Sequence, residues 1–426
     1  MPPAAPNALT HPMTHHLPLG GAMLGLRAYR EGGGLRGWEA AQGLAPRAIT
    51  ELVKASHLRG RGGAGFSTGV KWSAVPMGAA APRPKYLVVN ADEMEPGTFK
   101  DRLLLEQNPH LLLEGIAITA RAVEAEVAYI FLRGEYTLAA RRLRQAIQEA
   151  EAEDGLTCCR LHLHTSAGRY MCGEETGMLN ALEGRRANPR AKPPYPAVSG
   201  LWGKPTVVNN VETLCNLPGL LAHGVEWYRQ LSRTEDGGTK LYGVSGRVKH
   251  PGLWELPMGT TVGEILERAG GLRDGLRLRG LLPGGASTAF LTPAHLDLAM
   301  DFNALQAAGS RMGTGTMIVL DDHACPVGLV ANLIQFFARE SCGWCTPCWS
   351  GLGWADRLLH SLEAGRGQPG DLEKLGQLAG FWGPGATFCA LAPGAADPLR
   401  SALEHFGDDF ARHLTERHCP YGGTDA

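Results

Sequence analysis

Apolar residues along the chain follow two periodicities that alternate from residue 46 to residue 238. Compact apolar runs, which indicate strands, alternate with segments whose apolar residues recur every three to four positions, which indicate helices. Strands are predicted at residues 86–90, 127–132, 161–164 and 207–208, and helices at residues 48–57, 108–125 and 138–151. Such alternation is typical of an α/β domain whose mainly parallel sheet is covered by helices on both faces.

The pattern changes twice after this segment. Residues 239–322 carry short apolar runs separated by turn signals, with one helix predicted at residues 262–269, and indicate a small α+β module. From Val327 helical periodicity returns, and amphipathic segments at residues 352–362, 372–378 and 398–414 predict a small helical bundle. We therefore expect three domains, at residues 46–238, 239–322 and 323–426.

Residues 1–45 differ from the rest of the chain. They lack apolar periodicity and are rich in Pro, Gly and His. Segments of this composition bury little apolar surface and are poorly ordered unless something ties them down. The sequence therefore predicts an extended N-terminal arm that lies on a partner or on the body of the protein.

Charge and hydropathy exclude several classes of function. The chain carries 41 Lys and Arg residues against 42 Asp and Glu residues, so no excess positive charge attracts nucleic acid or anionic lipid. No uninterrupted apolar stretch is long enough to cross a membrane, and the start lacks the basic flank and apolar core of a secretory signal. We therefore expect a cytoplasmic protein whose ten cysteines are reduced and whose membrane association, if any, comes through partners.

Four cysteines occupy a metal-like arrangement. Cys342, Cys345 and Cys348 form a C-x2-C-x2-C motif, and Cys389 follows at a distance in the sequence. Three closely spaced thiolates plus a remote one are typical of a cubane iron-sulfur cluster. Structural zinc and purely structural thiols are the alternatives, although zinc sites more often pair two separate knuckles. The other cysteines show no ligand spacing and are interpreted as packing or exposed residues. They are Cys158, Cys159, Cys172, Cys215, Cys325 and Cys419.

A glycine-rich loop spans residues 60–65. Gly60, Gly62 and Gly65 satisfy G-x-G-x-x-G, a spacing that lets backbone amides approach a phosphate closely. A helix, rather than a strand, is predicted before this loop, so the standard dinucleotide-binding fingerprint does not apply. A plain surface loop is the alternative, but Lys71 and Trp72 add a cation and an aromatic face suited to a flavin or nucleotide.

Acidic and amide side chains follow the predicted strands. They are Asn90, Asp92, Glu93 and Glu95 after residues 86–90, Glu174 and Glu175 after residues 161–164, and Asn209 and Asn210 after residues 207–208. Side chains at strand ends of an α/β sheet can accept ribityl or ribose hydroxyls, and carboxylates would repel an added 2′-phosphate. The alternative is a set of solvated turns. Farther along, two prolines stiffen the segment from Lys192 to Tyr195, which would hold the tyrosine ring for stacking on a planar base.

Five segments together resemble one known family. They read GRGGAGFSTGVKW at residues 60–72, NADEMEPGTFKDR at 90–102, GEET at 173–176, GLWGKPTVVNNVET at 200–213 and SCGWCTPC at 341–348. In this order, and over nearly the whole chain, they resemble the NADH-binding flavoprotein subunit of bacterial respiratory complex I, a proton-pumping NADH:quinone oxidoreductase. The resemblance implies a flavodoxin-like FMN domain, a ubiquitin-like (β-grasp) module and a helical domain with one [4Fe-4S] cluster.

The resemblance also implies the residues of each site. Those implied for FMN are Gly60, Arg61, Gly62, Gly63, Lys71, Asn90, Asp92, Glu93, Gly173, Asn209 and Asn210. Those implied for the substrate NADH are Gly65, Phe66, Lys71, Glu95, Glu174, Glu175, Lys192 and Tyr195. Cys342, Cys345, Cys348 and Cys389 are implied as cluster ligands. Trp349 departs from the family, which usually carries Arg after the third cysteine, and Tyr195 replaces a more usual Phe.

The family further implies partners, a location and one close rival. The expected partners are a small thioredoxin-like [2Fe-2S] subunit and the large iron-sulfur subunit of a peripheral arm, on the cytoplasmic side of the inner membrane. The rival enzyme is the diaphorase subunit of an NAD-linked hydrogenase or formate dehydrogenase, which uses the same module. A rival of another class, a non-catalytic assembly subunit, is disfavoured because Lys71, the acidic loops and all four cluster cysteines are present.

Overall fold

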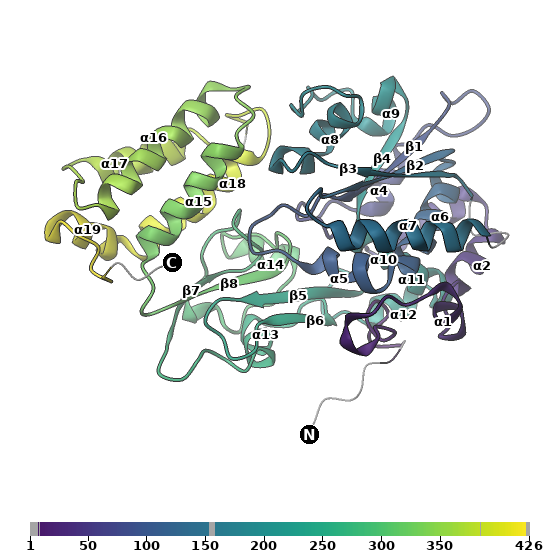
Figure 1. Cartoon of the computed structure of the whole chain (residues 1–426), viewed down its shortest axis with the longest axis horizontal. Helices are drawn as coiled ribbons and strands as arrows, with labels where there is room; N and C mark the ends of the chain where they lie inside the picture. The colour runs from purple at the N-terminus through teal and green to yellow at the C-terminus, as the bar shows by residue number, and fades with distance from the viewer. Residues whose placement is uncertain (1–6, 8, 153–157, 384, 423–426) are drawn as a thin grey trace. The chain divides into compact units, whose positions relative to one another are not determined.

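The computed structural model describes residues 7, 9–152, 158–383 and 385–422 (Figure 1). The chain divides into two compact units. The first comprises Met1–Met94, Phe99–Tyr242 and Leu253–Thr260, and the second comprises Glu95–Thr98, Gly243–Gly252 and Thr261–Ala426. The predicted α/β domain falls in the first unit, and the predicted helical domain falls in the second.

The first unit is built on a four-stranded sheet with the strand order β3-β2-β1-β4, in which every pair is parallel. The strands are β1 (Tyr86–Ala91), β2 (Val127–Leu132), β3 (Arg160–Thr165) and β4 (Thr206–Asn210). The predicted strands and the parallel sheet are therefore confirmed. Because β2 and β3 lie on one side of β1 and β4 lies on the other, the strand order reverses beside β1. Open α/β sheets bind ligands at such a switch point, beyond the carboxyl ends of the strands.

Helices cover both faces of this sheet. Val89 of β1 belongs to a large buried core that includes residues of α6 (Pro109–Val123) and α7 (Thr137–Ala152). Val88, its neighbour, belongs to a second cluster that includes residues of α8 (Glu175–Leu182). Successive side chains of a strand point to opposite faces, so an apolar run such as residues 86–90 serves both clusters.

Local sequence signals set the bounds of α6, the long core helix. The side chain of Asn108 accepts the N–H of Leu111, Pro109 occupies the first turn, and Glu124 ends the helix in a left-handed conformation with φ of 56°. The predicted helix at residues 108–125 is thus confirmed. The other helices of this unit are α1 (Leu26–Glu31), α2 (Arg36–Gln42), α3 (Pro46–Ala55), α4 (Thr68–Ser73), α5 (Lys100–Gln107), α9 (Pro196–Ser199), α10 (Val211–Cys215), α11 (Leu217–His223) and α12 (Val225–Gln230), with 3-10 turns at Leu19–Gly21, Tyr170–Gly173 and Leu201–Gly203.

The N-terminal segment is not the extended arm that the sequence predicts. From Leu26 onward it forms α1 and α2, and it buries Tyr29 and Trp38 in the main core of the first unit. Each helix is two turns or shorter, too short to show a clear apolar period or to be stable alone. Tertiary contacts therefore stabilise this segment, and such contacts leave no periodic signal in the sequence.

One buried carboxylate anchors the segment. Glu114 of α6 is fully buried, and it accepts the hydroxyl of Tyr29 and the N–H groups of Leu35 and Trp38, the last two at 2.9 Å. Burial raises the pKa of Glu114, although these donors act in the opposite direction. Three donors from one short stretch thus converge on a single side chain of the core.

Glu114→Gln is expected to destabilise the first unit by about 1–3 kcal/mol, because a neutral amide accepts weaker hydrogen bonds than a carboxylate. Urea unfolding of the full chain measures the loss, and limited trypsin digestion should show faster cleavage at Arg27 and Arg30. Glu39→Gln, at an exposed position of α2, is the matched control. Cleavage at the wild-type rate would show that Glu114 does not hold this segment.

The second unit contains an α+β region and a group of helices. The second sheet of the chain has the order β6-β5-β8-β7, in which β8 pairs parallel with β5 and antiparallel with β7. Strands β7 and β8 belong to the second unit, whereas Thr239–Tyr242 of β5 and Leu253–Pro257 of β6 are assigned to the first. The strands are β5 (Thr239–Ser245), β6 (Gly252–Pro257), β7 (Leu278–Leu282) and β8 (Thr316–Asp321). The predicted helix at residues 262–269 is α13 (Val262–Arg268), which begins at a capping box formed by Thr261 and Glu264. The short helix α14 (Phe302–Ala307) and a 3-10 turn at Pro293–His295 complete this region. The ubiquitin-like topology stays a prediction.

The helices predicted within residues 323–426 are confirmed, with one difference. The helices of this region are α15 (Pro326–Glu340), α16 (Thr346–Glu363), α17 (Asp371–Gly380), α18 (Leu391–His405) and α19 (Gly407–Glu416). The amphipathic segment predicted at residues 398–414 is two helices, because Phe406 leaves the helical region with φ of −126°. Pro398 lies inside α18, so it is not the start of a helix.

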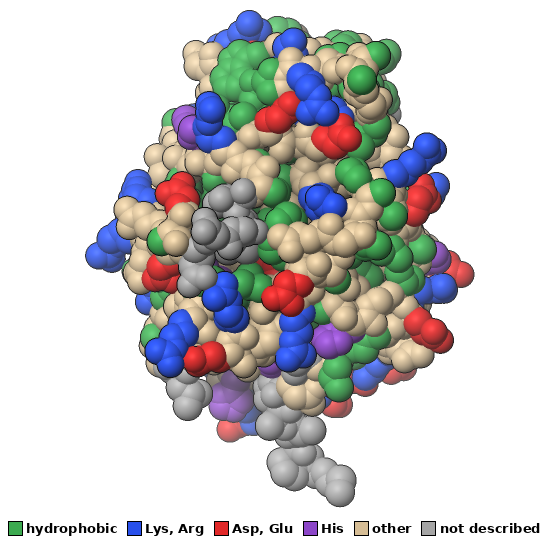
Figure 2. Space-filling view, turned by 90° about the vertical axis from the view of Figure 1, so that its right-hand side faces the viewer, with side chains coloured by type: hydrophobic (Ala, Val, Ile, Leu, Met, Phe, Trp, Pro, Cys, Tyr) green, Lys and Arg blue, Asp and Glu red, His purple; other side chains and the backbone are tan. Residues whose placement is uncertain are grey.

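None of the helices in the described ranges combines the length and the apolar character that a membrane crossing requires. The face drawn in Figure 2 carries basic and acidic side chains interspersed with one another. This mixture agrees with the nearly balanced charge of the sequence.

Candidate functional site

The glycine loop is closed by its own backbone. The N–H of Gly60 donates to the carbonyl of Phe66 at 2.9 Å, and Ser67 then caps α4. Gly63 and Gly65 have φ of 121° and 65°, a region that L side chains rarely adopt. These glycines are therefore required by the loop conformation itself, and the loop leads directly into the helix that carries Lys71.

The side chain of Arg61 points into the protein, away from any ligand on the loop. Its buried guanidinium donates to the carbonyls of Gly237 and Thr239 at 2.6 and 3.2 Å, and its N–H donates to the hydroxyl of Thr213 at 2.8 Å. These bonds fasten the glycine loop to the body of the first unit. A ligand at the loop can therefore meet only the backbone of Arg61.

The polar residues at the end of β1 are linked by hydrogen bonds to one another and to neighbouring loops. Asn90 donates from Nδ2 to the carbonyl of Gly173 at 3.0 Å, and its Oδ1 accepts the N–H of Asp92 at 3.2 Å. Asp92 in turn accepts the hydroxyl of Ser166 at 2.7 Å. The structure thus brings Gly173 to Asn90 and Asp92, although the sequence placed Gly173 on a separate loop.

The amides at the end of β4 are fixed from two directions. Asn209 accepts the indole N–H of Trp72 at 2.9 Å, and Asn210 donates to Asp101 at 2.6 Å. Gly62 packs against Asn210, because a Cβ added at Gly62 would lie 3.1 Å from the Cβ of Asn210. Trp72 is only 2% exposed, so it positions Asn209 instead of offering the ligand-facing aromatic ring that the sequence suggested.

Glu93 is directed toward helix α5. Its two carboxylate oxygens accept the N–H groups of Asp101 and Arg102 at 2.8 and 3.1 Å, and one also accepts the hydroxyl of Tyr136 at 2.9 Å. Burial, followed by the negative charge of Asp101, raises the pKa of Glu93 to about 7. The side chain therefore holds the first turn of α5, and only its backbone continues the strand-end loop.

Two lysines and two glutamates form an ionic cluster, and one of the lysines also contacts the backbone of β4. Lys71 donates to Glu175 at 3.3 Å and to the carbonyl of Val208 at 3.1 Å, while Lys192 contacts Glu175 at 2.7 Å and Glu174 at 3.5 Å. Glu174 also caps α8. Burial acts to raise the pKa of Glu175, but Lys71 and Lys192 outweigh it and lower that pKa. Glu175 is therefore an ionised acceptor between two cations.

The two aromatic side chains predicted for NADH are exposed although they are large and apolar. Phe66, at the end of the glycine loop, is 56% exposed, and Tyr195, just before α9, is 60% exposed. Exposed rings of this size are suited to stacking on a planar group. Both residues were predicted for NADH, and the short segment from Lys192 to Tyr195 offers a cation as well as a ring.

Glu95, the remaining residue predicted for NADH, belongs to the second unit. Its carboxylate accepts the N–H of Ser287 at 2.7 Å. Gly285 makes room for it, because a Cβ added there would lie 2.7 Å from the Cγ of Glu95. The acidic loop that the sequence treats as one element is thus shared between the two units, with Asp92 and Glu93 in the first.

The four predicted cluster cysteines gather in the second unit. Cys342 and Cys345 lie between α15 and α16, Cys348 lies in the first turn of α16, and Cys389 lies just before α18. Burial raises the pKa of Cys348 to about 12; the Ser341 hydroxyl, 3.3 Å away, lowers it, and the Cys345, Cys389 and Cys342 thiols raise it further. Three closely spaced thiols between and within the ends of α15 and α16, with a fourth just before α18, are the ligand type and number that an iron-sulfur cluster requires.

Aromatic residues surround this cysteine set. Trp344 and Phe388 lie with ring centroids 6.0 Å apart, and the indole N–H of Trp382 donates to the carbonyl of Pro347 at 2.9 Å. Trp349, which stands where the family usually has Arg, is 60% exposed. Neutral rings in place of a cation change the local charge that sets a cluster's potential.

Several residues that position the site were missed by sequence analysis. They are Ser166, Asp101, Tyr136, Thr213 and Glu212. Ser166, Asp101, Tyr136 and Thr213 act through contacts with residues of other segments, whereas Glu212 donates its N–H to Asn210, two residues earlier. The available signal was position: Asp101 lies inside the segment at residues 90–102, and Glu212 and Thr213 lie inside the segment at residues 200–213.

Comparisons with known proteins agree with this architecture. A family profile described as the Nuo51 FMN-binding domain matches residues 53–219, an SLBB domain matches residues 241–291, and the NADH-ubiquinone oxidoreductase-F iron-sulfur binding region matches residues 328–413. The last range contains Cys342, Cys345, Cys348 and Cys389.

Individual relatives cover almost the whole chain. The F subunit of NADH-quinone oxidoreductase in Salmonella typhimurium is 58% identical over 97% of this chain and 95% of its own length, and the Escherichia coli protein gives the same figures. The Streptomyces coelicolor protein of this name is 46% identical over 93% of this chain and 89% of its own. A solved NAD+-reducing [NiFe]-hydrogenase in the H2-reduced state superposes with a TM-score of 0.81 at 34% identity, covering 94% of this chain and 68% of that one.

The fold and the two sites define a flavoprotein that carries FMN and a [4Fe-4S] cluster in one chain. The chain belongs to the family of the NADH-quinone oxidoreductase F subunit. The resemblance drawn from the five motifs is thereby confirmed, and so are both cofactors, which favours a cluster over zinc at the C-x2-C-x2-C motif. Membership of this family also makes the chain one component of a larger complex.

Proposed function

We propose that this chain is the electron-input subunit of an NADH:quinone oxidoreductase: it oxidises NADH by hydride transfer to FMN and passes single electrons to a [4Fe-4S] cluster. The observation that carries the proposal is the gathering of Lys71, Asn90 and Asn209 at the carboxyl ends of β1 and β4, the switch point of the sheet. Polar groups at such a point are placed to hold a nucleotide-like cofactor.

The proposed FMN site uses backbone and side chains together. The loop glycines would approach the cofactor with their amides, Lys71 would supply a cation, and Asn90, Asp92 and Asn209 would bond its hydroxyls and ring edge. The complete set is Gly60, Arg61, Gly62, Gly63, Lys71, Asn90, Asp92, Glu93, Gly173, Asn209 and Asn210. Arg61 and Glu93 would contribute through the backbone, since their side chains are bonded within the protein.

The proposed NADH site lies on segments that present aromatic and charged groups. Phe66 and Tyr195 would stack on planar rings, and Glu175 would accept ribose hydroxyls. The complete set is Gly65, Phe66, Lys71, Glu95, Glu174, Glu175, Lys192 and Tyr195. Cys342, Cys345, Cys348 and Cys389 would hold the cluster.

When bound, FMN supplies the chemistry that accepts a hydride and releases its electrons one at a time. The chain itself needs no general base for this reaction. Its contribution is positioning: Trp72 and Asp101 fix the two strand-end amides, and the Arg61 guanidinium fastens the glycine loop to the body. Positional precision of this kind is worth several kcal/mol in a bimolecular transfer.

The proposed partners are a small thioredoxin-like [2Fe-2S] subunit and the large iron-sulfur subunit of a peripheral arm. Membership of a multisubunit enzyme supports this proposal, as does the separate cluster region of the second unit. The proposed location is the cytoplasmic side of the inner membrane, reached through the assembled complex. The proposed domain bounds remain residues 46–238, 239–322 and 323–426, after an N-terminal segment at 1–45.

The diaphorase of an NAD-reducing hydrogenase is the second candidate, since such an enzyme shares the fold. This chain covers 68% of that hydrogenase chain but 95% of the Escherichia coli relative, and the identities are 34% and 58%. The higher identity therefore favours the quinone-linked enzyme. Purification of the native complex and identification of its components would separate the two candidates.

The first experiment is an anaerobic NADH titration of the purified chain, reconstituted with its small iron-sulfur partner. Bleaching of flavin absorbance and rapid NADH-dependent reduction of ferricyanide are expected, because the FMN and NADH residues are all present. A chain that binds iron but neither FMN nor NADH would overturn the proposal and leave a structural component.

Glu175→Gln is expected to raise kcat/KM for NADPH relative to NADH by roughly ten- to hundredfold, as expected from the loss of one charge-assisted interaction. The carboxylate repels a 2′-phosphate, and its removal leaves the positive charges of Lys71 and Lys192 less balanced and so better able to attract one. Steady-state kinetics with both nucleotides measure the ratio. Glu235→Gln, an exposed carboxylate of the same unit, controls for net charge, and an equal change in both variants would contradict a specific role for Glu175.

A further inference from the structure

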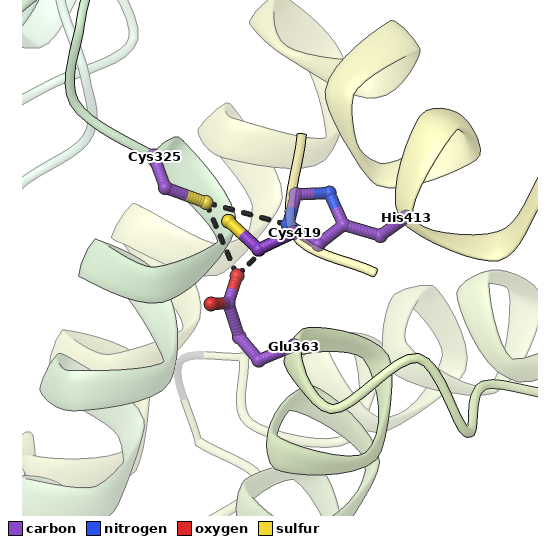
Figure 3. A group of neighbouring side chains, drawn as sticks. All are labelled: Cys325, Glu363, His413 and Cys419. Atoms are coloured by element: carbon purple, nitrogen blue, oxygen red, sulfur yellow. Dashed lines mark hydrogen bonds and ion pairs between the residues drawn. The ribbon is translucent and has the colours of Figure 1, made fainter. Parts of the chain in front are cut away.

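A second group of metal-ligating side chains lies in the helical region, apart from the four cluster cysteines. Cys325, Glu363, His413 and Cys419 each offer one donor atom, and these atoms all lie within 4.8 Å of one another. Figure 3 shows the four side chains pointing toward a common centre. Sequence spacing did not indicate this group, since Cys325 and Cys419 stand alone and were interpreted as packing or exposed residues.

Four separate chain segments contribute to the group. Cys325 caps the start of α15, Glu363 is the last residue of α16, His413 lies in α19, and Cys419 follows that helix. Convergence of thiol, imidazole and carboxylate from unrelated segments is hard to explain by packing, because apolar residues would fill such a junction at less desolvation cost.

The backbone around Cys419 is shaped to bring it back to the group. Arg417 ends α19 in a left-handed conformation with φ of 55°, which reverses the chain. The reversed segment rests on Gly365, where an added Cβ would lie 1.9 Å from the carbonyl oxygen of Arg417. Gly365 itself has φ of 67°. A tight glycine turn after α16 therefore seats the segment that carries Cys419 beside Glu363.

The donor spacing is close to that of a tetrahedral site. Cys325 Sγ lies 3.1 Å from Glu363 Oε1 and 3.4 Å from His413 Nε2, and that nitrogen lies 2.9 Å from Glu363 Oε1. Zinc bonds to sulfur, nitrogen and oxygen give tetrahedron edges of about 3.3–3.8 Å. An outward shift of a few tenths of an ångström would thus open the group around an ion.

Hydrogen bonds outside the group orient two of its donors. Nδ1 of His413 donates to the carbonyl of Asp409 at 2.6 Å, which turns Nε2 toward the centre. The Sγ of Cys325 accepts the N–H of Gly328 at 3.2 Å, which fixes the position of the sulfur at the start of α15. Metal-binding histidines commonly donate their second nitrogen to a carbonyl or carboxylate in this way.

The group lies at the opposite end of α15 and α16 from the cluster cysteines. Cys325 precedes α15 and Cys342 follows it, and a helix of its 15 residues is about 22 Å long. Helix α16 runs back from Cys348 to Glu363. The two helices thus form a hairpin with the cluster at its closed end and the second group at its open end.

We propose that Cys325, Glu363, His413 and Cys419 bind one zinc-type divalent ion in a closed, four-coordinate structural site. Two thiolates and an imidazole favour zinc over magnesium or calcium, and four protein ligands leave no open position for catalysis. The ion ties the open end of the α15–α16 hairpin to α19 and to the segment that follows it. The site is independent of the proposed hydride transfer.

The test uses the full chain loaded with FMN and its iron-sulfur cluster, incubated with Zn²⁺ alone, desalted, and analysed for zinc and iron together. About one zinc per chain is expected beside the cluster iron, as in a structural site with four protein ligands. Cys419→Ser should bind zinc at least tenfold more weakly while retaining iron and NADH-dependent ferricyanide reduction. Cys158→Ser, a free cysteine of the first unit, is the matched control and should retain both metals.

Two further measurements keep the outcome clear. Co²⁺ in place of Zn²⁺ should give the thiolate charge-transfer absorption of a tetrahedral site in the wild-type chain, a result that needs no variant to fold. Cys345→Ser, which removes a cluster cysteine, should keep its zinc. Absence of the cobalt band, loss of zinc in Cys345→Ser, or equal zinc content in Cys325→Ser/Cys419→Ser and wild type would each overturn the proposal.

Discussion

Glu212→Ala is expected to destabilise the first unit by about 3–5 kcal/mol, the loss typical of removing one partner from a buried ion pair. Glu212 is fully buried, and its Oε2 lies 2.8 Å from the ammonium of Lys240 and 2.9 Å from that of Lys100. Its other oxygen accepts the N–H of Leu241 at 2.8 Å. Without this carboxylate, Lys240 stays in an apolar interior with no opposite charge among the contacts described, while Lys100 keeps Asp101.

Urea unfolding of the full chain, followed by circular dichroism, measures this loss. Glu31→Ala is the control, because Glu31 pairs with Arg27 on the surface and should change stability little. A double-mutant cycle with Lys240→Met isolates the pair, since Glu212→Ala should be less harmful once the buried lysine is gone. Equal losses in both backgrounds would show that Glu212 does not act through Lys240.

The same residue predicts how stability depends on pH. Burial alone would raise the pKa of Glu212, but Lys100 and Lys240 outweigh it and lower the pKa to about 2. In the unfolded chain the pKa of a glutamate is about 4.3. The folded state therefore binds fewer protons between these values, so its stabilisation is complete above about pH 5 and lost as pH falls toward 2. Glu212→Gln should remove this part of the acid dependence.

The Glu212 network also supports the proposed FMN site. Lys100 contacts Asp101 at 2.7 Å, and Asp101 accepts Asn210, one of the amides at the end of β4. The N–H of Glu212 itself donates to Asn210. A weaker network should therefore lower FMN affinity under conditions in which the chain is still folded, because the amide loses its fixed orientation.

Much of the fold could be predicted because its signals are local. The helix α6 carries its own cap, its proline and its apolar pattern, and the strands of the parallel sheet are compact apolar runs. The N-terminal segment could not be predicted, since α1 and α2 depend on the buried carboxylate of Glu114, a residue far along the chain. Sequence patterns report short-range order and miss such long-range anchors.

The candidate site, like the fold, could be predicted only in part. Motif spacing located the loops and the four cysteines, and the comparisons bear out the family and its cofactors. Motif spacing did not indicate which way each side chain points. Arg61, Trp72 and Glu93 lie in motifs that suggest ligand binding, yet their side chains form hydrogen bonds with other groups of the protein. Whether a polar side chain faces a ligand or its own scaffold depends on donors of other segments, which no single motif contains.

Loss of one proposed cluster cysteine is expected to block electron transfer from the flavin to quinone while leaving reduction of the flavin by NADH intact. Cys345→Ser should reduce the amount of bound iron. It should also lower NADH-dependent quinone reduction by the assembled complex by roughly a hundredfold or more, a larger loss than that caused by changing a residue that only contacts a metal ligand. A serine oxygen is a much poorer ligand for an iron-sulfur cluster than a thiolate. The fold should persist, because residue 345 caps α16 and serine is a favoured N-cap.

The part of the reaction before the cluster should survive in this variant. Residue 345 belongs to neither proposed nucleotide site, so NADH reduction of the flavin, and with it ferricyanide reduction, should stay near the wild-type rate. Both activities are compared in the same preparation, with Cys158→Ser as a control for the loss of any thiol. Quinone reduction that continues at the wild-type rate without bound iron would show that electrons leave the flavin by a route outside these four cysteines, and the proposed role of the cluster would then need revision.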